Sequence, residues 1–464
     1  MLYINKSRAA NALGNEKLYS LMPYLNTNSS TSATIIAAED SLRRYIEAII
    51  SLFNAKEVIP VQNFHLVKLK HKKPYGEVST AAFGVEQAAQ VLRFHQSFPE
   101  YNITPLVKLE HLARELGIKE LYVKDESYRF GLNAFKVLGG SYAIAREIGQ
   151  RLRLPESELN YATLVLPEVR KQLGELTFVT ATDGNHGRGV AWTAQRLGQR
   201  AVVFMPKGTA AERLENIRKL GADASITDVN YDDAVRMAQN YAKLHGGVVV
   251  QDTSWEGYNE IPQYIMQGYT TMGYEIMQQL KKYGDVKPTH VFLQAGVGAM
   301  AGATVGFIAD YYKEERPQIV VVEPNNADCL YRTALANDGR LHNVGGALHS
   351  IMAGLCCGEP CSLGWQQLAA YADYFVSMPD KAAALGMRIL GNPLPGDTAI
   401  ISGESGAAGV GLLAAALREK QLKRLADSIK LNENSVAVCI STEGATDAEN
   451  YYRIMWDGAW SWRS

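Results

Sequence analysis

Lys136 is the residue whose setting points most directly to chemistry. It lies in the segment 130–140, where every other side chain except Asn133 is apolar or a glycine, so no charged residue is close to it along the chain. Asn133 is a suitable N-cap for a helix over 134–152, which would place Lys136 in the first turn, where the helix dipole disfavours a cation. The dipole and burial would both lower its pKa, and a neutral lysine amine can form a Schiff base with a carbonyl compound. The alternative is an ordinary surface lysine.

A second candidate is the glycine-containing turn at 180–189, which follows a predicted strand and begins a helix. Its glycines allow a ligand to approach the backbone, and its free N–H groups suit an anion such as a substrate carboxylate. Thr182, Gly184 and His186 are therefore candidate substrate contacts. Asp183 lies in the same turn, where a carboxylate is electrostatically unfavourable, so its presence indicates use as an acid or a base. An ordinary turn between a strand and a helix is the alternative.

The segment 294–303 is the best candidate for binding a phosphate, because it follows a predicted strand, is rich in glycine and begins a helix. It lacks the Lys-Ser/Thr ending of a nucleoside-triphosphate loop. Gly296 and Gly298 approach a dinucleotide-binding pattern, but Gly302 comes one residue too late for it. A single phosphate is therefore favoured over a nucleotide, and a turn that only allows close helix packing is the alternative.

Three other segments lie at predicted strand ends or helix starts. Residues 402–409 begin a helix, and residues 441–444 follow a predicted strand. The hydroxyl of Thr442 could form one hydrogen bond with a ring nitrogen without holding it protonated, as an aspartate would. Asp252 also follows a predicted strand, at an edge where the other candidates converge. Each of these could instead be only a helix N-cap.

The composition favours a small-molecule ligand. The chain has 464 residues, with 47 Lys and Arg against 48 Asp and Glu, so its net charge of -1 gives no field that would attract nucleic acid or an anionic membrane. The length allows two or more domains. We find neither an apolar run of membrane-spanning length nor a secretory leader, which predicts a cytoplasmic protein.

The five cysteines are too few and too clustered for a disulfide scaffold. Cys356, Cys357 and Cys361 lie close together, but the nearest histidines are not at a usual metal-ligand spacing. We therefore expect buried thiols or an occasional disulfide, and no metal site.

From about residue 120 the pattern alternates between strands and helices, which predicts an α/β fold. The predicted strands span 121–123, 176–181, 201–205, 248–251, 290–294, 319–323 and 436–440, and the predicted helices span 134–152, 189–197, 210–220, 231–244, 268–280 and 299–312. Such an order predicts a mostly parallel sheet covered on both faces, with ligands beyond the carboxyl ends of the strands.

Residues 1–59 form a predicted N-terminal extension. The polar run 26–32 indicates a flexible link, and the spacing of apolar residues over 39–55 predicts an amphipathic helix. This helix could pack on the body or on a partner chain, but we expect no catalytic role for it.

Taken in order, these segments resemble the fold-type II pyridoxal 5'-phosphate enzymes, the group of tryptophan synthase β and the threonine and serine dehydratases. Within this group, residues 124–136, 181–189 and 252–258 resemble the diaminopropionate ammonia-lyases. The resemblance runs from about residue 60 to the C-terminus. The dehydratases usually carry a Ser-Gly-Asn-His-type loop where this chain has residues 182–186, and Asp183 marks the lyase branch.

The resemblance implies two three-layer α/β/α domains with mostly parallel sheets and the cofactor between them. Residues 60–140 and 266–464 would form the large, cofactor-binding domain, and residues 141–265 would form a small domain that carries the substrate loop. The family also suggests a homodimer.

The resemblance further implies roles for individual residues. Lys136 would bind pyridoxal phosphate as a Schiff base, Phe135 would pack against its ring, and Asn185 would bond its hydroxyl. Thr442 would meet the pyridine nitrogen, and Glu404 belongs to the same predicted cofactor site. The phosphate would lie on the loop of Gly296, Val297, Gly298, Ala299 and Met300.

The implied activity is α,β-elimination of 2,3-diaminopropionate through an aminoacrylate, giving pyruvate and two ammonia. Lys136 would remove the α-proton from one face of the substrate and Asp183 could serve the other, so both enantiomers are expected substrates. Asp183 and Asp252 would also suit the second ammonium of the substrate, and either could protonate or orient the leaving amine.

Three alternatives stay open. A threonine or serine dehydratase would use the same cofactor. A protein that keeps the cofactor fold only to bind a ligand is disfavoured by the joint presence of Lys136, Asp183 and Asp252. A dinucleotide oxidoreductase would need an acidic residue at the end of the strand after the Gly296 loop, and Glu323 lies there.

Overall fold

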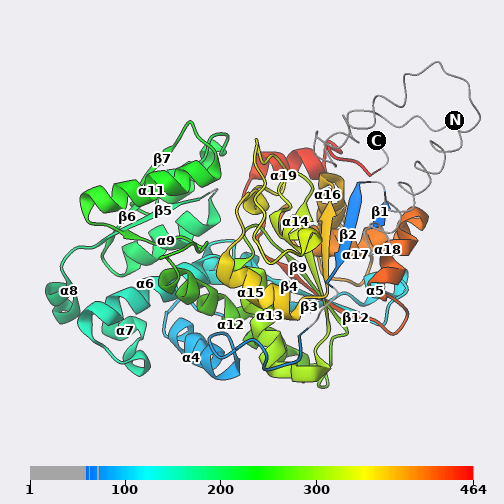
Figure 1. Cartoon of the computed structure of the whole chain (residues 1–464), viewed down its shortest axis with the longest axis horizontal. Helices are drawn as coiled ribbons and strands as arrows, with labels where there is room; N and C mark the ends of the chain where they lie inside the picture. Colours follow the sequence, from blue (N-terminus) through cyan, green and yellow to red (C-terminus); the bar gives the residue numbers. More distant parts are fainter. Residues whose placement is uncertain (1–58, 62, 70–72, 183, 463–464) are drawn as a thin grey trace, which may run out of the picture. The chain divides into compact units, whose positions relative to one another are not determined.

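The computed structural model describes residues 59–61, 63–69, 73–182 and 184–462 of the chain (Figure 1). The polar run at 26–32 and the helix predicted over 39–55 lie outside these residues, as does Asp183. Ile59–Ser464 form one compact unit.

An eight-stranded sheet runs in the order β1-β2-β11-β10-β9-β12-β4-β3. Its strands are β1 (Ile59–Val61), β2 (Phe64–Lys68), β3 (Leu106–Lys108), β4 (Glu120–Asp125), β9 (His290–Gln294), β10 (Gln318–Pro324), β11 (Tyr374–Met378) and β12 (Val436–Ser441). The strands from β11 to β4 are parallel to one another, and β1, β2 and β3 add antiparallel pairs at the edges.

A four-stranded sheet runs in the order β7-β6-β5-β8 and is entirely parallel. Its strands are β5 (Thr177–Ala181), β6 (Arg200–Met205), β7 (Asp223–Ile226) and β8 (Val248–Val249). This sheet lies to the left in Figure 1, and the larger sheet lies to its right. Together the two sheets confirm the predicted α/β class with mostly parallel strands.

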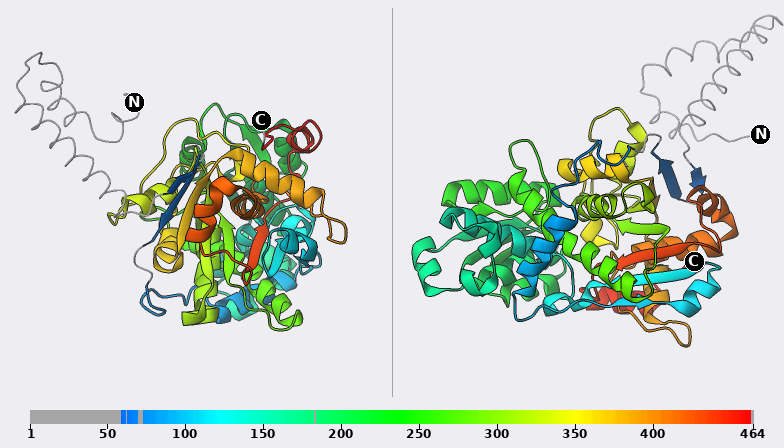
Figure 2. Two further views of the ribbon diagram at one scale, coloured as in Figure 1. Left: turned by 90° about the vertical axis from the view of Figure 1, so that its right-hand side faces the viewer. Right: turned by 90° about the horizontal axis from the view of Figure 1, so that it is seen from below.

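Helices separate most of the strands. In chain order they are α4 (Val85–Gln96), α5 (Glu110–Glu115), α6 (Val137–Leu152), α7 (Tyr161–Leu164), α8 (Pro167–Leu173), α9 (Asn185–Arg196), α10 (Ala211–Arg218), α11 (Tyr231–His245), α12 (Glu260–Lys282), α13 (Ala299–Tyr312), α14 (Cys329–Ala336), α15 (Ser362–Tyr371), α16 (Asp380–Gly391), α17 (Ala408–Arg418), α18 (Lys423–Ser428) and α19 (Ala448–Met455). Figure 2 shows them on both sides of the strands.

Both faces of the large sheet are buried, as the apolar strand pattern predicts. Along β9, Val291 and Leu293 belong to one core, which includes residues of α6, α12 and α13. The intervening Phe292 belongs to another core, which includes residues of α16 and α17. Since successive side chains of a strand point to opposite faces, each face has its own layer of helices.

The division into a large and a small domain stays a prediction. Strands β5 to β8 all fall within the predicted small domain, 141–265. However, Phe178 of the small sheet and Val291 of the large sheet belong to one continuous core, and residues 59–464 form one compact unit.

Close helix packing fixes the start of α6, next to Lys136. A Cβ atom on Gly268 of α12 would lie 2.3 Å from the carbonyl oxygen of Leu138. A Cβ atom on Gly189 of α9 would lie 2.7 Å from the Cα atom of Val137. Only glycine allows these approaches, so α9 and α12 both press against the residues that follow Lys136.

A buried ion network anchors the segment before Lys136 to α12. Lys124 Nζ lies 2.6 Å from Glu275 Oε2, and Arg129 Nη1 lies 2.8 Å from Glu275 Oε1. Arg129 Nη2 also lies 2.8 Å from Glu126 Oε1. All four side chains are fully buried, so two cations and two carboxylates balance each other out of contact with water.

Most predicted elements are confirmed, with shifts at their ends, of which the largest is at α12, predicted from 268 but beginning at Glu260. The predictions at 290–294 and 299–312 match β9 and α13 at both ends, and the other predicted strands overlap β4, β5, β6, β8, β10 and β12. The helix predicted from 134 begins only at Val137. Asn133 is not its N-cap, because it adopts a left-handed conformation (φ 59°), and its side-chain amide donates to the carbonyl oxygen of Ala445 at 3.2 Å.

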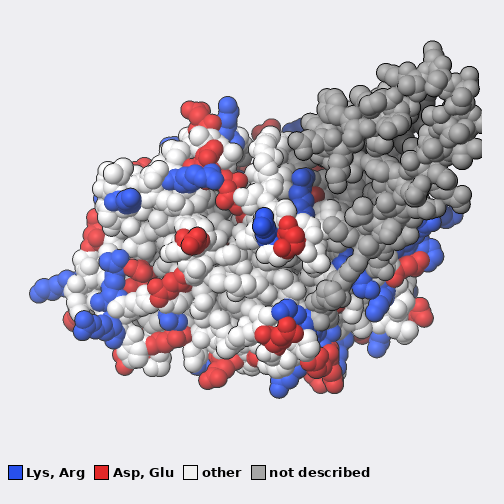
Figure 3. All heavy atoms as spheres, viewed as in Figure 1, with Lys and Arg blue, Asp and Glu red and all other residues white. Residues whose placement is uncertain are grey.

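Charged side chains of both signs are interspersed on the face shown in Figure 3. Within the described ranges, no helix combines the length and apolarity needed to cross a bilayer.

Candidate active site

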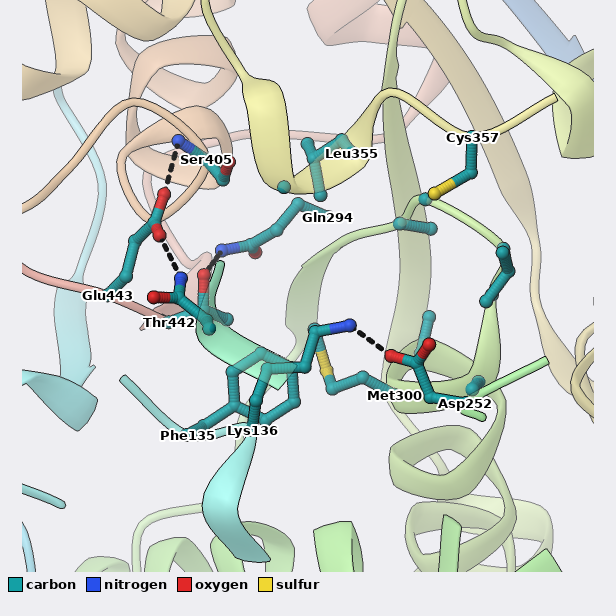
Figure 4. A pocket seen from close by; sticks show the side chains of 18 residues that line it. Phe135, Lys136, Asp252, Gln294, Met300, Leu355, Cys357, Ser405, Thr442 and Glu443 are labelled. Atoms are coloured by element: carbon teal, nitrogen blue, oxygen red, sulfur yellow. Dashed lines mark hydrogen bonds and ion pairs between the residues drawn. The ribbon is translucent and has the colours of Figure 1, made fainter. Parts of the chain in front are cut away.

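A cavity lined by Lys136 lies where the carboxyl ends of β9 and β12 meet the starts of α6, α9 and α13 (Figure 4). It brings together most of the residues predicted for the cofactor site, from segments far apart in the sequence. Its lining residues are Phe135, Lys136, Asn185, Asp252, Gln294, Ala295, Gly296, Val297, Gly298, Ala299, Met300, Ala301, Gly354, Leu355, Cys357, Ser405, Thr442 and Glu443.

A second, larger cavity of about 620 Å³ shares Lys136, Asp252, Gly354 and Cys357 with the first. Its wall includes two of the predicted substrate contacts, Thr182 and His186. The amine of Lys136 therefore stands between a cavity with the predicted cofactor residues and a cavity with predicted substrate residues.

Lys136 occupies the N-cap position of α6 and forms an ion pair with Asp252. Its side chain is 19% exposed and that of Asp252 is 3% exposed. Figure 4 shows the two side chains pointing toward each other. Lys136 has no charged neighbour along the sequence, but in the folded chain a carboxylate reaches it. The apolar neighbours of Lys136 along the sequence therefore do not describe its neighbours in the folded chain.

Asp252 is a buried carboxylate. Burial by itself raises the pKa of Asp252, but the charges of Lys136 and then His186 outweigh burial and lower the pKa to about 2. Its second oxygen accepts a hydrogen bond from the hydroxyl of Tyr231 at 3.4 Å. Asp252 is not a helix N-cap, because the next helix, α12, begins at Glu260. The N-cap alternative is thereby excluded.

The predicted phosphate loop connects β9 to α13. Gly298 has φ 94°, a conformation that other residues adopt only under strain, and it directly precedes the first residue of the 14-residue helix α13. A Cβ atom on Gly296 would lie 3.1 Å from Cys357 Sγ and 3.2 Å from the Cα atom of Leu355. The free N–H groups at the start of α13 and the absence of side chains at both glycines suit a phosphate.

Thr442 and Gln294 also line the first cavity. Gln294 Nε2 donates to Thr442 Oγ1 at 3.0 Å and to the carbonyl oxygen of Ile440 at 2.8 Å. Gln294 Oε1 and Ser405 Oγ are buried, and neither has a hydrogen-bond partner among the described residues. Buried polar atoms that line a cavity without a partner indicate a polar ligand. Sequence reasoning named the segments 294–303 and 402–409, which contain these two residues, but gave neither residue a role.

Asn185 is the first residue of α9, and its side-chain amide donates to the carboxylate of Glu443. Sequence reasoning named the segment that contains Glu443 but assigned a role only to Thr442. A carboxylate just after the end of a predicted strand, beside a candidate already named, is the signal that could have found it.

Glu404 does not line the cavity, although it was a predicted cofactor contact. It is buried and accepts a hydrogen bond from the side-chain amide of Asn450. Burial, and then the neighbouring charge of Glu443, raises the pKa of Glu404 to about 7. Its direct contact with a cofactor stays a prediction.

Side-chain hydrogen bonds at both ends hold the predicted substrate turn. Thr182 Oγ1 accepts from the backbone N–H of Gly184 at 2.9 Å, and His186 Nε2 donates to the carbonyl oxygen of Val250 at 2.8 Å. Asp183 lies outside the described residues, so its role stays a hypothesis.

All five cysteines are free thiols. Cys361 Sγ accepts a hydrogen bond from the backbone N–H of Gly364 at the start of α15. Across the described parts of the chain, no cluster of histidine, cysteine and carboxylate side chains has the arrangement of a metal site.

The residues that line the first cavity fit pyridoxal phosphate. They combine a lysine amine, the ring of Phe135 beside it, a hydroxyl at Thr442 and glycines at the start of a long helix. The two buried polar atoms without partners, on Gln294 and Ser405, agree with a polar ligand in this place.

Comparison with protein families matches residues 98–441 to the pyridoxal-phosphate dependent enzymes. The chain is 49% identical over 393 residues to the diaminopropionate ammonia-lyase of Escherichia coli strain K12, an alignment that covers 84% of this chain and 97% of that protein.

Solved structures of the same Escherichia coli lyase are also similar to this chain. The crystal structure of the Escherichia coli diaminopropionate ammonia lyase in complex with D-serine superimposes with a TM-score of 0.80 at 47% identity, covering 87% of this chain and 99% of that one. The structure of the same lyase in complex with an aminoacrylate-PLP azomethine reaction intermediate has a TM-score of 0.79, with the same identity and coverage.

Proposed function

Because the chain belongs to the pyridoxal-phosphate dependent enzymes and, within them, to the diaminopropionate ammonia-lyases, we propose that it converts 2,3-diaminopropionate to pyruvate and two ammonia by α,β-elimination. The observation that carries this function is the convergence of Lys136, Asp252, Thr442 and the Gly296 loop on one cavity. The alternative of a dinucleotide oxidoreductase is excluded, because the chain belongs to the pyridoxal-phosphate dependent enzymes.

The residues that line the first cavity would hold the cofactor as follows. Lys136 would bind it covalently, Phe135 would pack against its ring, and Asn185 and Thr442 would form polar contacts with the ring. The five residues Gly296, Val297, Gly298, Ala299 and Met300 would hold its phosphate. When bound, pyridoxal phosphate supplies the electron sink that makes the α-proton of an amino acid acidic.

The chain's own residues would move the protons. Once the substrate amine displaces it, Lys136 Nζ is free to take the α-proton from one face. Asp252 forms an ion pair with this amine, so its carboxylate can hold the ammonium that results or contact the second ammonium of the substrate. Asp183 is proposed as the base for the other face, which would admit the D-enantiomer as well as the L-enantiomer.

Relative turnover tests this function against the dehydratase alternative, because the lyase should have a higher kcat/KM for diaminopropionate than for serine or threonine. Elimination from diaminopropionate releases one ammonia at the β-carbon and a second when the product hydrolyses, whereas serine or threonine yields only one. We expect two ammonia for each pyruvate formed from diaminopropionate. A protein that binds the cofactor but forms no keto acid from any of these amino acids would support the ligand-binding alternative instead.

We further propose a homodimer, which the family suggests, and a cytoplasmic location, which the sequence predicts. Sedimentation of the purified chain would test the first, with an expected mass of twice its 51.0 kDa. Fractionation of the source cells would test the second.

A further inference from the structure

Glu443 is a buried carboxylate that accepts hydrogen bonds from two distant segments and from its own. It accepts from the side-chain amide of Asn185, from the backbone N–H of Ser405 at 3.3 Å and from the hydroxyl of Thr446 at 3.2 Å. Its side chain lines the cavity, and the residue is 2% exposed. A carboxylate with this many donors is fixed in one orientation.

The backbone around Glu443 is paired with the segment that leads to Lys136. Glu443 forms an antiparallel bridge with Ala134. The N–H of Phe135 donates to the carbonyl oxygen of Thr442 at 3.1 Å, and the N–H of Gly444 donates to that of Asn133 at 3.0 Å. Residues 442–444 therefore connect the lysine segment to Asn185.

The chemistry of the contact orients the amide of Asn185. An ionised carboxylate can only accept, so the NH₂ end of the amide must face Glu443, and the carbonyl end of the same group then has a defined direction. If the acceptor were replaced by another amide, either end of Asn185 could face it, because an amide both donates and accepts.

We propose that Glu443 is a positioning residue, which fixes the side-chain amide of Asn185 and so the polar contact that Asn185 makes with bound pyridoxal phosphate. The inference rests on the proposed function, because it takes Asn185 as a cofactor contact. Glu443 acts through Asn185 and need not touch a reacting atom.

The test is a double-mutant cycle with cofactor binding as its readout. Glu443→Gln keeps the shape of the side chain and removes its charge, and we expect it to weaken the affinity of the cofactor-free protein for pyridoxal phosphate about tenfold. In an Asn185→Ala background the same substitution should change the affinity less than about twofold. The absorption spectrum of the bound cofactor, recorded against pH, should shift in Glu443→Gln and in Asn185→Ala alike.

Glu433→Gln is the matched control, because Glu433 is an exposed residue in the loop before β12. It should leave affinity and spectrum unchanged. If Glu443→Gln does not fold, as judged by circular dichroism, Glu443→Asp keeps the charge with a shorter reach and should give a smaller loss of the same kind.

Two results would overturn the inference. One is an unchanged affinity and spectrum in Glu443→Gln, and the other is an equally large loss with and without Asn185, which would show that Glu443 acts independently of it. Both readouts are taken without substrate. A failure of the diaminopropionate assay would therefore overturn the proposed function and leave this test standing.

Discussion

The amine of Lys136 and the carboxylate of Asp252 form an ion pair, although 116 positions separate them in the sequence (Figure 4). The pair forms because the end of β8 and the start of α6 meet at one cavity. Asp252 gives the ammonium form of Lys136 a partner, so the lysine is not held neutral by its apolar sequence neighbours alone. When the substrate amine later displaces Lys136, the carboxylate of Asp252 is close enough to contact either ammonium.

Loss of the Asp252 charge should impair turnover. Asp252→Asn keeps the size of the side chain but removes the negative charge that pairs with an ammonium and cannot take part in proton transfer. We expect kcat/KM for diaminopropionate to fall by about 10²–10⁴-fold, the usual contribution of a positioned acid or base. Steady-state keto-acid formation measures this, with Asp228→Asn, at an exposed position after β7, as the control. Retention of more than about half of the activity would show that the ion pair has no role in the reaction.

Substitution of Asp183 should separate the two enantiomers. If Lys136 and Asp183 serve opposite faces of the substrate, Asp183→Asn should lower kcat/KM strongly for one enantiomer and only weakly for the other. The assay compares pyruvate release from D- and L-diaminopropionate by the same preparation. Equal losses for both enantiomers would rule out the two-face hypothesis.

Glu404 should make the stability of the protein depend on pH. Its pKa is raised by burial and then by Glu443 to about 7, from a usual value of 4.5. Between these values the folded protein binds more protons than the unfolded chain, so stability falls as the pH rises through this window, by about 3 kcal/mol.

Glu404→Gln should remove this contribution. Urea unfolding at about pH 5 and at about pH 8 would then show a smaller loss of stability in the variant than in the unmodified protein. The same loss in both proteins would mean that Glu404 ionises normally.

Glu275 should be essential to the stability of the body. Glu275→Gln would leave the buried cations Lys124 and Arg129 with Glu126 as their remaining carboxylate in the network. Breaking a buried pair on one side costs about 3–5 kcal/mol, and we expect a loss of this size in denaturant unfolding at neutral pH. Glu86→Gln, at an exposed position on α4, serves as the control. Equal stability of the two variants would contradict the account of the network.

The parts of the fold with a strong local pattern could be predicted. β9 is a fully buried apolar run that leads into glycines, and α13 follows it, so both matched at their ends. β11 is also fully buried, but short apolar runs of this kind do not distinguish a strand from a helix, and it was not predicted. β7 alternates around a single buried residue, Ala224, which leaves little apolar signal.

Individual residues of the site could be predicted, but the contacts between these residues could not. Lys136, Asp252 and Thr442 were each found as candidates at strand ends or helix starts, and all three line the cavity. Which strand ends meet depends on sheet order, so neither the ion pair of Lys136 nor the contact between Asn185 and Glu443 could be inferred. Asn133 has the right type for an N-cap, but asparagine also tolerates the left-handed conformation that it adopts here.

The most direct test of the central claim compares kcat/KM for D- and L-diaminopropionate, serine and threonine in the protein loaded with pyridoxal phosphate, with Lys136→Ala beside it. We expect diaminopropionate to give the highest value and Lys136→Ala to form no keto acid from any of the four. Turnover of threonine or serine equal to or above that of diaminopropionate would contradict the lyase assignment, and keto-acid formation by Lys136→Ala would contradict the role of Lys136.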